Sequence, residues 1–100
     1  MTKEEIESKR LELELIHKDT VHACTVFDNK SNIVVGFLKE PNRTTKMMAL
    51  DKAISSPSTA GATVLEACLI KDASDPRIMD EKKSNDHIYI GFCLKALGLI

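Results

Sequence analysis

The sequence has almost no net charge and no long apolar run. Its 14 basic and 15 acidic residues are interspersed and give a net charge of −1. A protein that binds nucleic acid or an anionic lipid surface usually carries a basic patch, and none stands out here. No apolar stretch approaches the roughly 18 residues that a membrane span needs, and no secretory signal follows the first residue. We therefore expect a soluble intracellular protein that binds neither nucleic acid nor membrane.

Cysteines are few and widely separated. Cys24, Cys68 and Cys93 each stand among apolar residues. An odd number of scattered thiols does not make a disulfide framework, whereas buried free cysteines are common in cytosolic proteins. The sequence therefore predicts three reduced thiols.

The chain also lacks a recognisable catalytic, metal-binding or phosphate-binding motif. His22 and Cys24 would share one strand face, but no second pair of ligands stands at metal-binding spacing. The acidic residues between 72 and 81 lack the fixed positions and the central glycine of a calcium loop. A nucleophilic thiolate needs an electropositive setting, and the cysteines have apolar neighbours. We expect no enzyme activity, no cofactor and no metal.

Residues 33–53 are the stretch around which the rest is organised. Residues 33–38 are almost continuously apolar, which is typical of a strand covered on both faces. Gly36 interrupts this strand, and we expect it to let the following helix approach closely. Pro41 then ends the strand because it lacks an amide donor.

A helix is predicted from about residue 43 to residue 55, capped by Asn42 or Thr44. Its apolar residues recur at i, i+3 and i+7, with one more alongside, and they predict a single face that shares a core with the strand: Met47, Leu50, Ile54 and Met48.

The N-terminal segment is predicted to be a helix from Lys3 to about His17. Thr2 and Glu5 form a capping box, and four apolar residues lie along or beside one side: Ile6, Leu13, Leu15 and Ile16. Residues 11–15 also alternate as a strand would, so this half of the helix has a second interpretation.

A β-hairpin follows, with a strand at residues 20–27 and a polar five-residue loop at 28–32. A two-stranded hairpin is only marginally stable alone, so helices or a strand from another subunit must cover it. The free edge of residues 20–27 leaves room for a homo-oligomer.

Two more helices are predicted after residue 55. Ser56 and Pro57 start one that runs to about Ile70, with small residues at 60–62 that permit close helix contact. Residues 71–85 are a polar loop, with a short turn at 78–79 that turns its apolar side chains inward. Ser84 caps the last helix, whose apolar face between residues 88 and 100 is wide. The predicted fold class is α+β: an N-terminal helix, an antiparallel β-hairpin, then three helices packed on it, in one domain spanning residues 1–100.

The order of these elements resembles a family of small tailed-bacteriophage proteins known as tail assembly chaperones. The resemblance covers roughly residues 19–100 and rests on the segment FLKEP at 37–41 with Arg43 two positions later, on the helix start at Ser56, and on Leu65 with Cys68 near a helix end. The chain departs from the family pattern at residues 69–71, where tryptophan or glycine is common, and in its uncharged end at residue 100.

This resemblance implies a non-enzymatic protein of the host cytoplasm, in some cases virion-associated, that binds an extended helical tape-measure protein through apolar surfaces. The alternative is a small structural virion protein of the head, connector or tail. The predicted partner-binding residues are Lys39, Pro41, Arg43, Met47, Met48, Ile88 and Phe92.

Two of these groups also have a plainer interpretation. Lys39, Arg43 and Lys46 would place three cations around the Pro41 turn, but nearby carboxylates dilute their field, and a solvated surface is the default. The two methionines could form an adaptable binding groove or could fill the core.

Overall fold

Four α-helices and one antiparallel hairpin make up the part of the chain that the computed structural model describes, residues 2–100. The elements follow one another as α1 (Lys3–His17), β1 (Val21–Phe27), β2 (Ile33–Lys39), α2 (Arg43–Ala53), α3 (Pro57–Cys68) and α4 (Asp86–Leu97). Three short 3₁₀ turns fill the segment between α3 and α4. The predicted α+β fold class and its element order are confirmed.

The hairpin pairs β1 with β2 in a register that sets Cys24 opposite Gly36. Its five-residue loop is closed by Asp28, whose side chain accepts hydrogen bonds from the amides of Lys30 (2.8 Å) and Asn32 (2.9 Å). This Asx-type arrangement replaces backbone hydrogen bonds that the turn cannot make.

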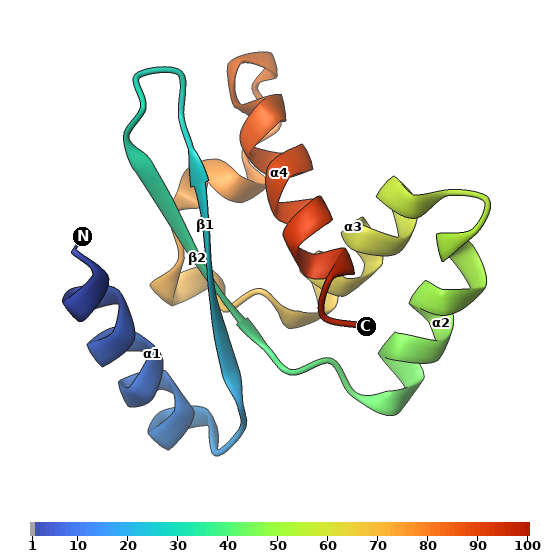
Figure 1. Cartoon of the computed structure of the whole chain (residues 1–100), viewed down its shortest axis with the longest axis horizontal. Coiled ribbons are helices and arrows are strands. Elements are labelled where there is room, and N and C mark those ends of the chain that lie inside the picture. The colour runs from blue at the N-terminus through green and yellow to red at the C-terminus, as the bar shows by residue number, and fades with distance from the viewer. Residues whose placement is uncertain (1) are drawn as a thin grey trace.

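Helices cover the two faces of the hairpin unequally (Figure 1). α1 lies against one face and packs mainly on β1, whereas α4 lies against the other face and packs on α3. α2 packs mainly on α3, so it is the element farthest from α1. The hairpin is therefore the middle layer of a helix, sheet, helix arrangement.

Because side chains alternate along β2, each face of the hairpin has its own core. Val35 and Phe37 pack with Leu13 of α1, and Val34 and Leu38 pack with α3 and α4. Phe37 and Leu38 are fully buried, as the apolar pattern predicts.

Two glycines let elements approach closely. A Cβ atom at Gly61 would lie 2.2 Å from the carbonyl oxygen of Cys93. The close contact of α3 with α4 at this position therefore requires a residue without a side chain. At Gly36 a Cβ atom would lie 2.8 Å from the ring of Phe92 and 2.9 Å from Ile78. The expectation that Gly36 serves the following helix is wrong, because α4 and the 3₁₀ turn Pro76–Met79 occupy that space.

The start of α1 is capped as predicted, since Thr2 and Glu5 exchange side-chain and backbone hydrogen bonds of 3.1 Å. The predicted apolar side of α1 is only partly right. Leu13 is buried and Ile6 partly so, but Leu15 and Ile16 are exposed, because α1 touches the hairpin along a narrow strip.

The predicted start of α3 is confirmed, with Ser56 at the N-cap position and Pro57 as the first helical residue, whereas the start of α4 needs correction. Ser56 precedes α3, but its side chain makes no capping hydrogen bond. α4 begins at Asp86 and not after Ser84, because residues 83–85 form a 3₁₀ turn first. The predicted inward turn at 78–79 is present, with Ile78 buried and Met79 half-buried.

No helix within residues 2–100 is long and apolar enough to cross a membrane.

We predict that Gly61→Ala destabilises the protein by about 1–3 kcal/mol, because the added methyl group overlaps the backbone of Cys93. Gly98→Ala is the matched control: Gly98 has a helical φ of −68°, so we expect a change within about 0.5 kcal/mol. Chemical denaturation measures both. Equal midpoints for the two variants would contradict the close contact of α3 and α4.

Candidate functional site

The outer side of α2 exposes large apolar side chains, and α2 packs mainly on one other helix, α3. Its start is fixed by Asn42, whose side-chain oxygen accepts a hydrogen bond of 2.8 Å from the amide of Thr45. Met47, Leu50 and Ile54 recur at i, i+3 and i+7 and are 56%, 52% and 97% exposed. We call these three residues, with Met48, the α2 stripe.

The α2 stripe was predicted to face the core, and that prediction is wrong. The core side of α2 is instead formed by Ala49, which is fully buried, and Ala53, which is partly buried. These alanines are four residues apart and meet Ala60 and Val64 of α3. A helix with a single neighbour buries one narrow face, and here small residues take it so that the two helices lie close together.

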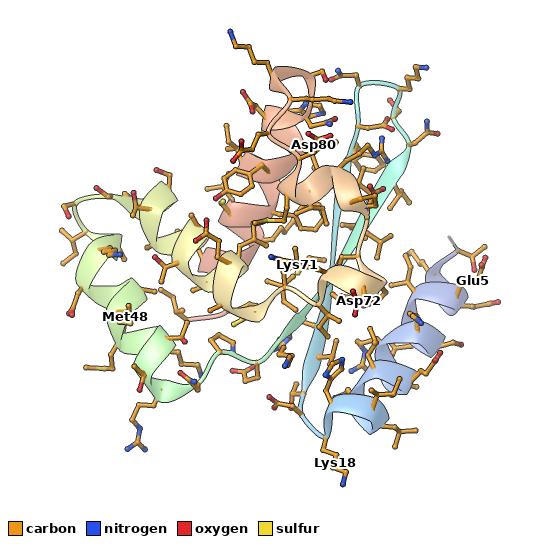
Figure 2. The ribbon with its side chains drawn as sticks, turned by 180° about the vertical axis from the view of Figure 1, so that it is seen from behind. Glu5, Lys18, Met48, Lys71, Asp72 and Asp80 are labelled. Carbon is orange, nitrogen blue, oxygen red and sulfur yellow. The ribbon has the colours of Figure 1, made fainter. Side chains whose placement is uncertain are left out.

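Met48 is half-exposed and lies beside Met47 in the sequence, about 100° further round the helix. Figure 2 shows its side chain on α2, at the far end of the molecule from Lys18 and α1. Methionine is flexible and polarizable, so an exposed pair of methionines can adapt to an apolar partner. The plainer interpretation, in which Met47 and Met48 fill the core, is excluded by their exposure.

Of the three cations near Pro41, Lys46 is the one whose ion pair the described residues show. Lys46 pairs with Glu40 at 3.0 Å, and the other Glu40 oxygen contacts His22 of β1. These two partners, His22 first, hold the pKa of Glu40 below its usual value. Arg43 is exposed at the start of α2, and Lys39 is half-buried. Glu40 therefore ties Lys46, near the start of α2, to His22 of the hairpin.

Three predicted partner-binding residues lie where no partner can reach them. Pro41 is buried in the turn, and Ile88 and Phe92 are buried in the core beneath α4. The ring of Phe92 lies next to Gly36 of β2. The apolar face of α4 therefore packs against the hairpin and is buried in the molecule. We therefore remove Pro41, Ile88 and Phe92 from the candidate surface. The roles of Lys39, Arg43, Met47 and Met48 stay predictions.

Leu50 and Ile54 belong to the candidate surface although they were assigned to the core. A sequence signal for this exists: alanines at 49 and 53 stand one helical turn apart, and small residues follow at 60–62 on the next helix. Such matched small residues indicate two helices in close contact, which leaves the larger side chains of α2 outside.

A polar cavity lies beside the hairpin loop, with a volume of about 340 Å³. Two of its charged groups pair with each other, since Arg77 donates a hydrogen bond to Asp28 (3.1 Å), and Arg77 also donates to Asp75 (2.9 Å). Arg77 thus links the hairpin loop to the 3₁₀ turn that carries buried Ile78. This arrangement is structural, because Arg77 has its carboxylate partners within the chain.

Reactive groups are not activated in this structure. Burial raises the pKa of the Cys24, Cys68 and Cys93 thiols, so they stay protonated at neutral pH and are poor nucleophiles. Within residues 2–100, no three His, Cys, Asp or Glu side chains come together in a group that could hold a metal ion.

Comparisons of the chain with family models, with curated proteins and with solved structures found no match.

We predict that Arg77→Met lowers stability at neutral pH and that this loss shrinks as the pH falls towards 2. Arg77 holds the pKa of Asp75 below its usual value, and the Asn32 amide, with Arg77, does the same for Asp28. Carboxylates with a depressed folded-state pKa stabilise the fold above their unfolded pKa of about 3.9, and the effect is lost as pH falls through the folded pKa. Denaturation midpoints at a series of pH values measure this.

Lys82→Met is the control for Arg77→Met, since Lys82 is exposed and its side chain makes no ion pair within residues 2–100. A destabilisation by Arg77→Met that stays constant from neutral pH to pH 2 would contradict the carboxylate pairing.

Proposed function

We propose that this protein is a non-enzymatic tail assembly chaperone of the tailed-bacteriophage type, acting in the host cytoplasm on a helical tape-measure-type protein. The observation that carries the proposal is the α2 stripe. A helix that leaves Met47, Leu50 and Ile54 exposed presents anchors at i, i+3 and i+7, a spacing that suits contact with another amphipathic helix.

The surroundings of the α2 stripe support binding through apolar burial. The chain has a net charge of −1, and Lys46, which precedes Met47 in α2, is paired with Glu40. Exposed apolar residues grouped on one helix face are typical of a protein-binding surface. Covering the apolar faces of a long helical partner would keep that partner from aggregating before assembly.

The alternative is a permanent structural component of the virion, which would use the same surfaces. The proposed partner is a protein in both cases, and a second copy of the chain at the hairpin edge belongs to either alternative. The number of copies in purified particles separates the two, because a chaperone leaves the assembled tail and a virion component stays at a fixed copy number.

We expect the tape-measure-type protein encoded in the same genome to bind with a negative heat-capacity change and little dependence on salt, as apolar burial requires. Leu50→Glu should weaken this binding at least about tenfold, because it places a charge in the centre of the buried contact. Titration calorimetry at two temperatures and two salt concentrations measures each quantity.

Leu15→Glu is the matched control, since Leu15 is an exposed apolar residue on α1. Its binding should equal that of the wild type. Equal binding by wild type and Leu50→Glu, or affinity that falls steeply with salt, would refute the proposed apolar contact.

A further inference from the structure

The two edges of the hairpin differ in how their backbone groups are used. The outer edge of β2 is closed by the segment after α3. The amide of Ile70 donates to the carbonyl of Phe37 (2.8 Å), the amide of Phe37 donates to Ser74 Oγ (3.0 Å), and the amide of Asp75 donates to the carbonyl of Val35 (3.0 Å). No further strand can pair on that side.

The outer edge of β1 is open over three positions. In an antiparallel pair, successive residues direct their N–H and C=O groups alternately towards the partner strand and away from it. The Glu40 amide donates to the Thr20 carbonyl, and the Asp28 amide donates to the Asn32 carbonyl. The backbone groups of the even-numbered residues of β1 therefore face β2, and those of Ala23, Thr25 and Phe27 face outward. Within residues 2–100 the outward backbone groups of these three residues have no hydrogen-bond partner.

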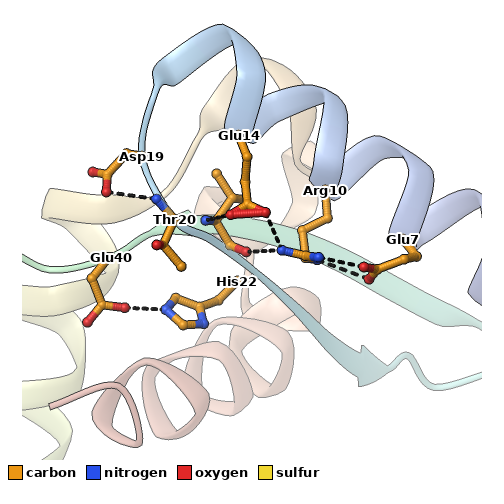
Figure 3. Close-up of polar contacts among 8 residues, drawn as sticks. Glu7, Arg10, Glu14, Asp19, Thr20, His22 and Glu40 are labelled. Atoms are coloured by element: carbon orange, nitrogen blue, oxygen red, sulfur yellow. Dashed lines mark hydrogen bonds and ion pairs between the residues drawn. The ribbon is translucent and has the colours of Figure 1, made fainter.

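The open stretch of the β1 edge cannot be extended at either end. At Val21 the amide donates to Glu14 (3.4 Å), and the carbonyl accepts from Arg10 (3.3 Å), as Figure 3 shows. At the other end the loop 28–32 turns the chain back. The open edge therefore consists of Ala23, Thr25 and Phe27, and Thr25 is its centre.

The β1 edge also lacks the features by which proteins usually block strand pairing. Its sequence, VHACTVF, has no lysine and no proline, and its register with β2 is continuous without a bulge. Phe27 at its end is 65% exposed, and Ile33 opposite it is 45% exposed. Unpaired backbone groups thus lie beside an uncovered apolar pair.

We propose that β1 pairs with β1 of a second copy of this chain, antiparallel, with Thr25 on the two-fold axis. Thr25 then lies opposite its own copy, and Ala23 lies opposite Phe27 of the second copy. The product is a four-stranded sheet in the order β2, β1, β1, β2.

The ends of the open edge select this register and this occupant. With Thr25 on the axis, all three open positions of one copy meet the three open positions of the other. A shift of two residues in one direction would set Phe27 against Val21, whose backbone groups Glu14 and Arg10 already hold. A shift in the other direction would set Ala23 against the loop. An edge whose donors and acceptors are symmetric about one residue is complementary to itself, and a two-fold contact closes as a dimer.

The experiment places like and unlike charges on the two-fold axis. Thr25 is exposed, so its side chain can be replaced without disturbing the core. We expect the wild type to form a reversible dimer with a dissociation constant below about 1 mM, measured by sedimentation equilibrium. Thr25→Lys and Thr25→Glu should each weaken the dimer at least about tenfold, because like charges directly opposite repel. An equimolar mixture of the two variants should dimerise again.

Thr25→Val is the control, since valine is uncharged and has nearly the size and shape of threonine, so this variant should remain dimeric. Melting followed by circular dichroism should show Thr25→Lys and Thr25→Glu folded as the wild type is. A wild type that is monomeric throughout the concentration range would overturn the proposal. A dimer that Thr25→Lys leaves unchanged, or variants that fail to recover in the mixture, would also overturn it.

This dimer does not depend on the proposed chaperone function, because β1 and α2 are separate surfaces. Leu50→Glu should leave the dimer intact, and Thr25→Lys should leave the binding of a helical partner intact. Each proposal can therefore fail without the other.

Discussion

β2 is enclosed on all four sides, and the rest of the fold depends on that enclosure. One edge pairs with β1, and the other is held by Ile70, Ser74 and Asp75. One face packs on α1 and the other on α3, α4 and Ile78. A strand with its backbone satisfied and both faces buried loses little by having no polar side chain, and residues 34–38, which are all buried, contain none.

Enclosing β2 determines what is left exposed. The polar segment after α3 is used on the β2 edge, where Ser74 is buried and its hydroxyl both accepts from Phe37 and donates to the carbonyl of Ile70 (2.7 Å). Within residues 2–100, no equivalent segment bonds to the β1 edge between residues 23 and 27. α4 is likewise used as the cover of the second face, so α2 is left outside α3 with the α2 stripe in solvent. The two proposed interaction surfaces are thus among the places that the fold does not cover.

The sequence predicted most of the elements and few of their neighbours. Local signals were sufficient for α1, whose capping box marks its start, and for the hairpin, whose polar loop separates two β-rich runs. The burial of Phe37 followed from an apolar strand between helices. The start of α3 at Pro57 was also predicted, although the Ser56 side chain makes no capping hydrogen bond, whereas α4 starts later than predicted because Ser84 lies within a 3₁₀ turn.

The candidate site was the part that sequence reasoning handled least well. An amphipathic pattern shows that a helix has an apolar side, but which neighbour covers that side is a tertiary property. α2 buries Ala49 and exposes Leu50, whereas α4 buries Ile88 and Phe92, which had been assigned to a partner. The position of α4 depends on the contacts of Gly61 with Cys93 and of Gly36 with Phe92. Each contact joins residues more than 30 positions apart in the sequence.

Residue-resolved amide hydrogen exchange in dilute solution tests the central claim, that one edge of the hairpin is closed and the other open. The account predicts alternating protection along β1, with slow exchange at Cys24 and Val26 and fast exchange at Thr25. It also predicts that Phe37, whose amide donates to buried Ser74, exchanges at least about 100-fold more slowly than Thr25. A Thr25 amide as protected as that of Cys24 in the dilute chain, or a Phe37 amide as fast as that of Thr25, would contradict it.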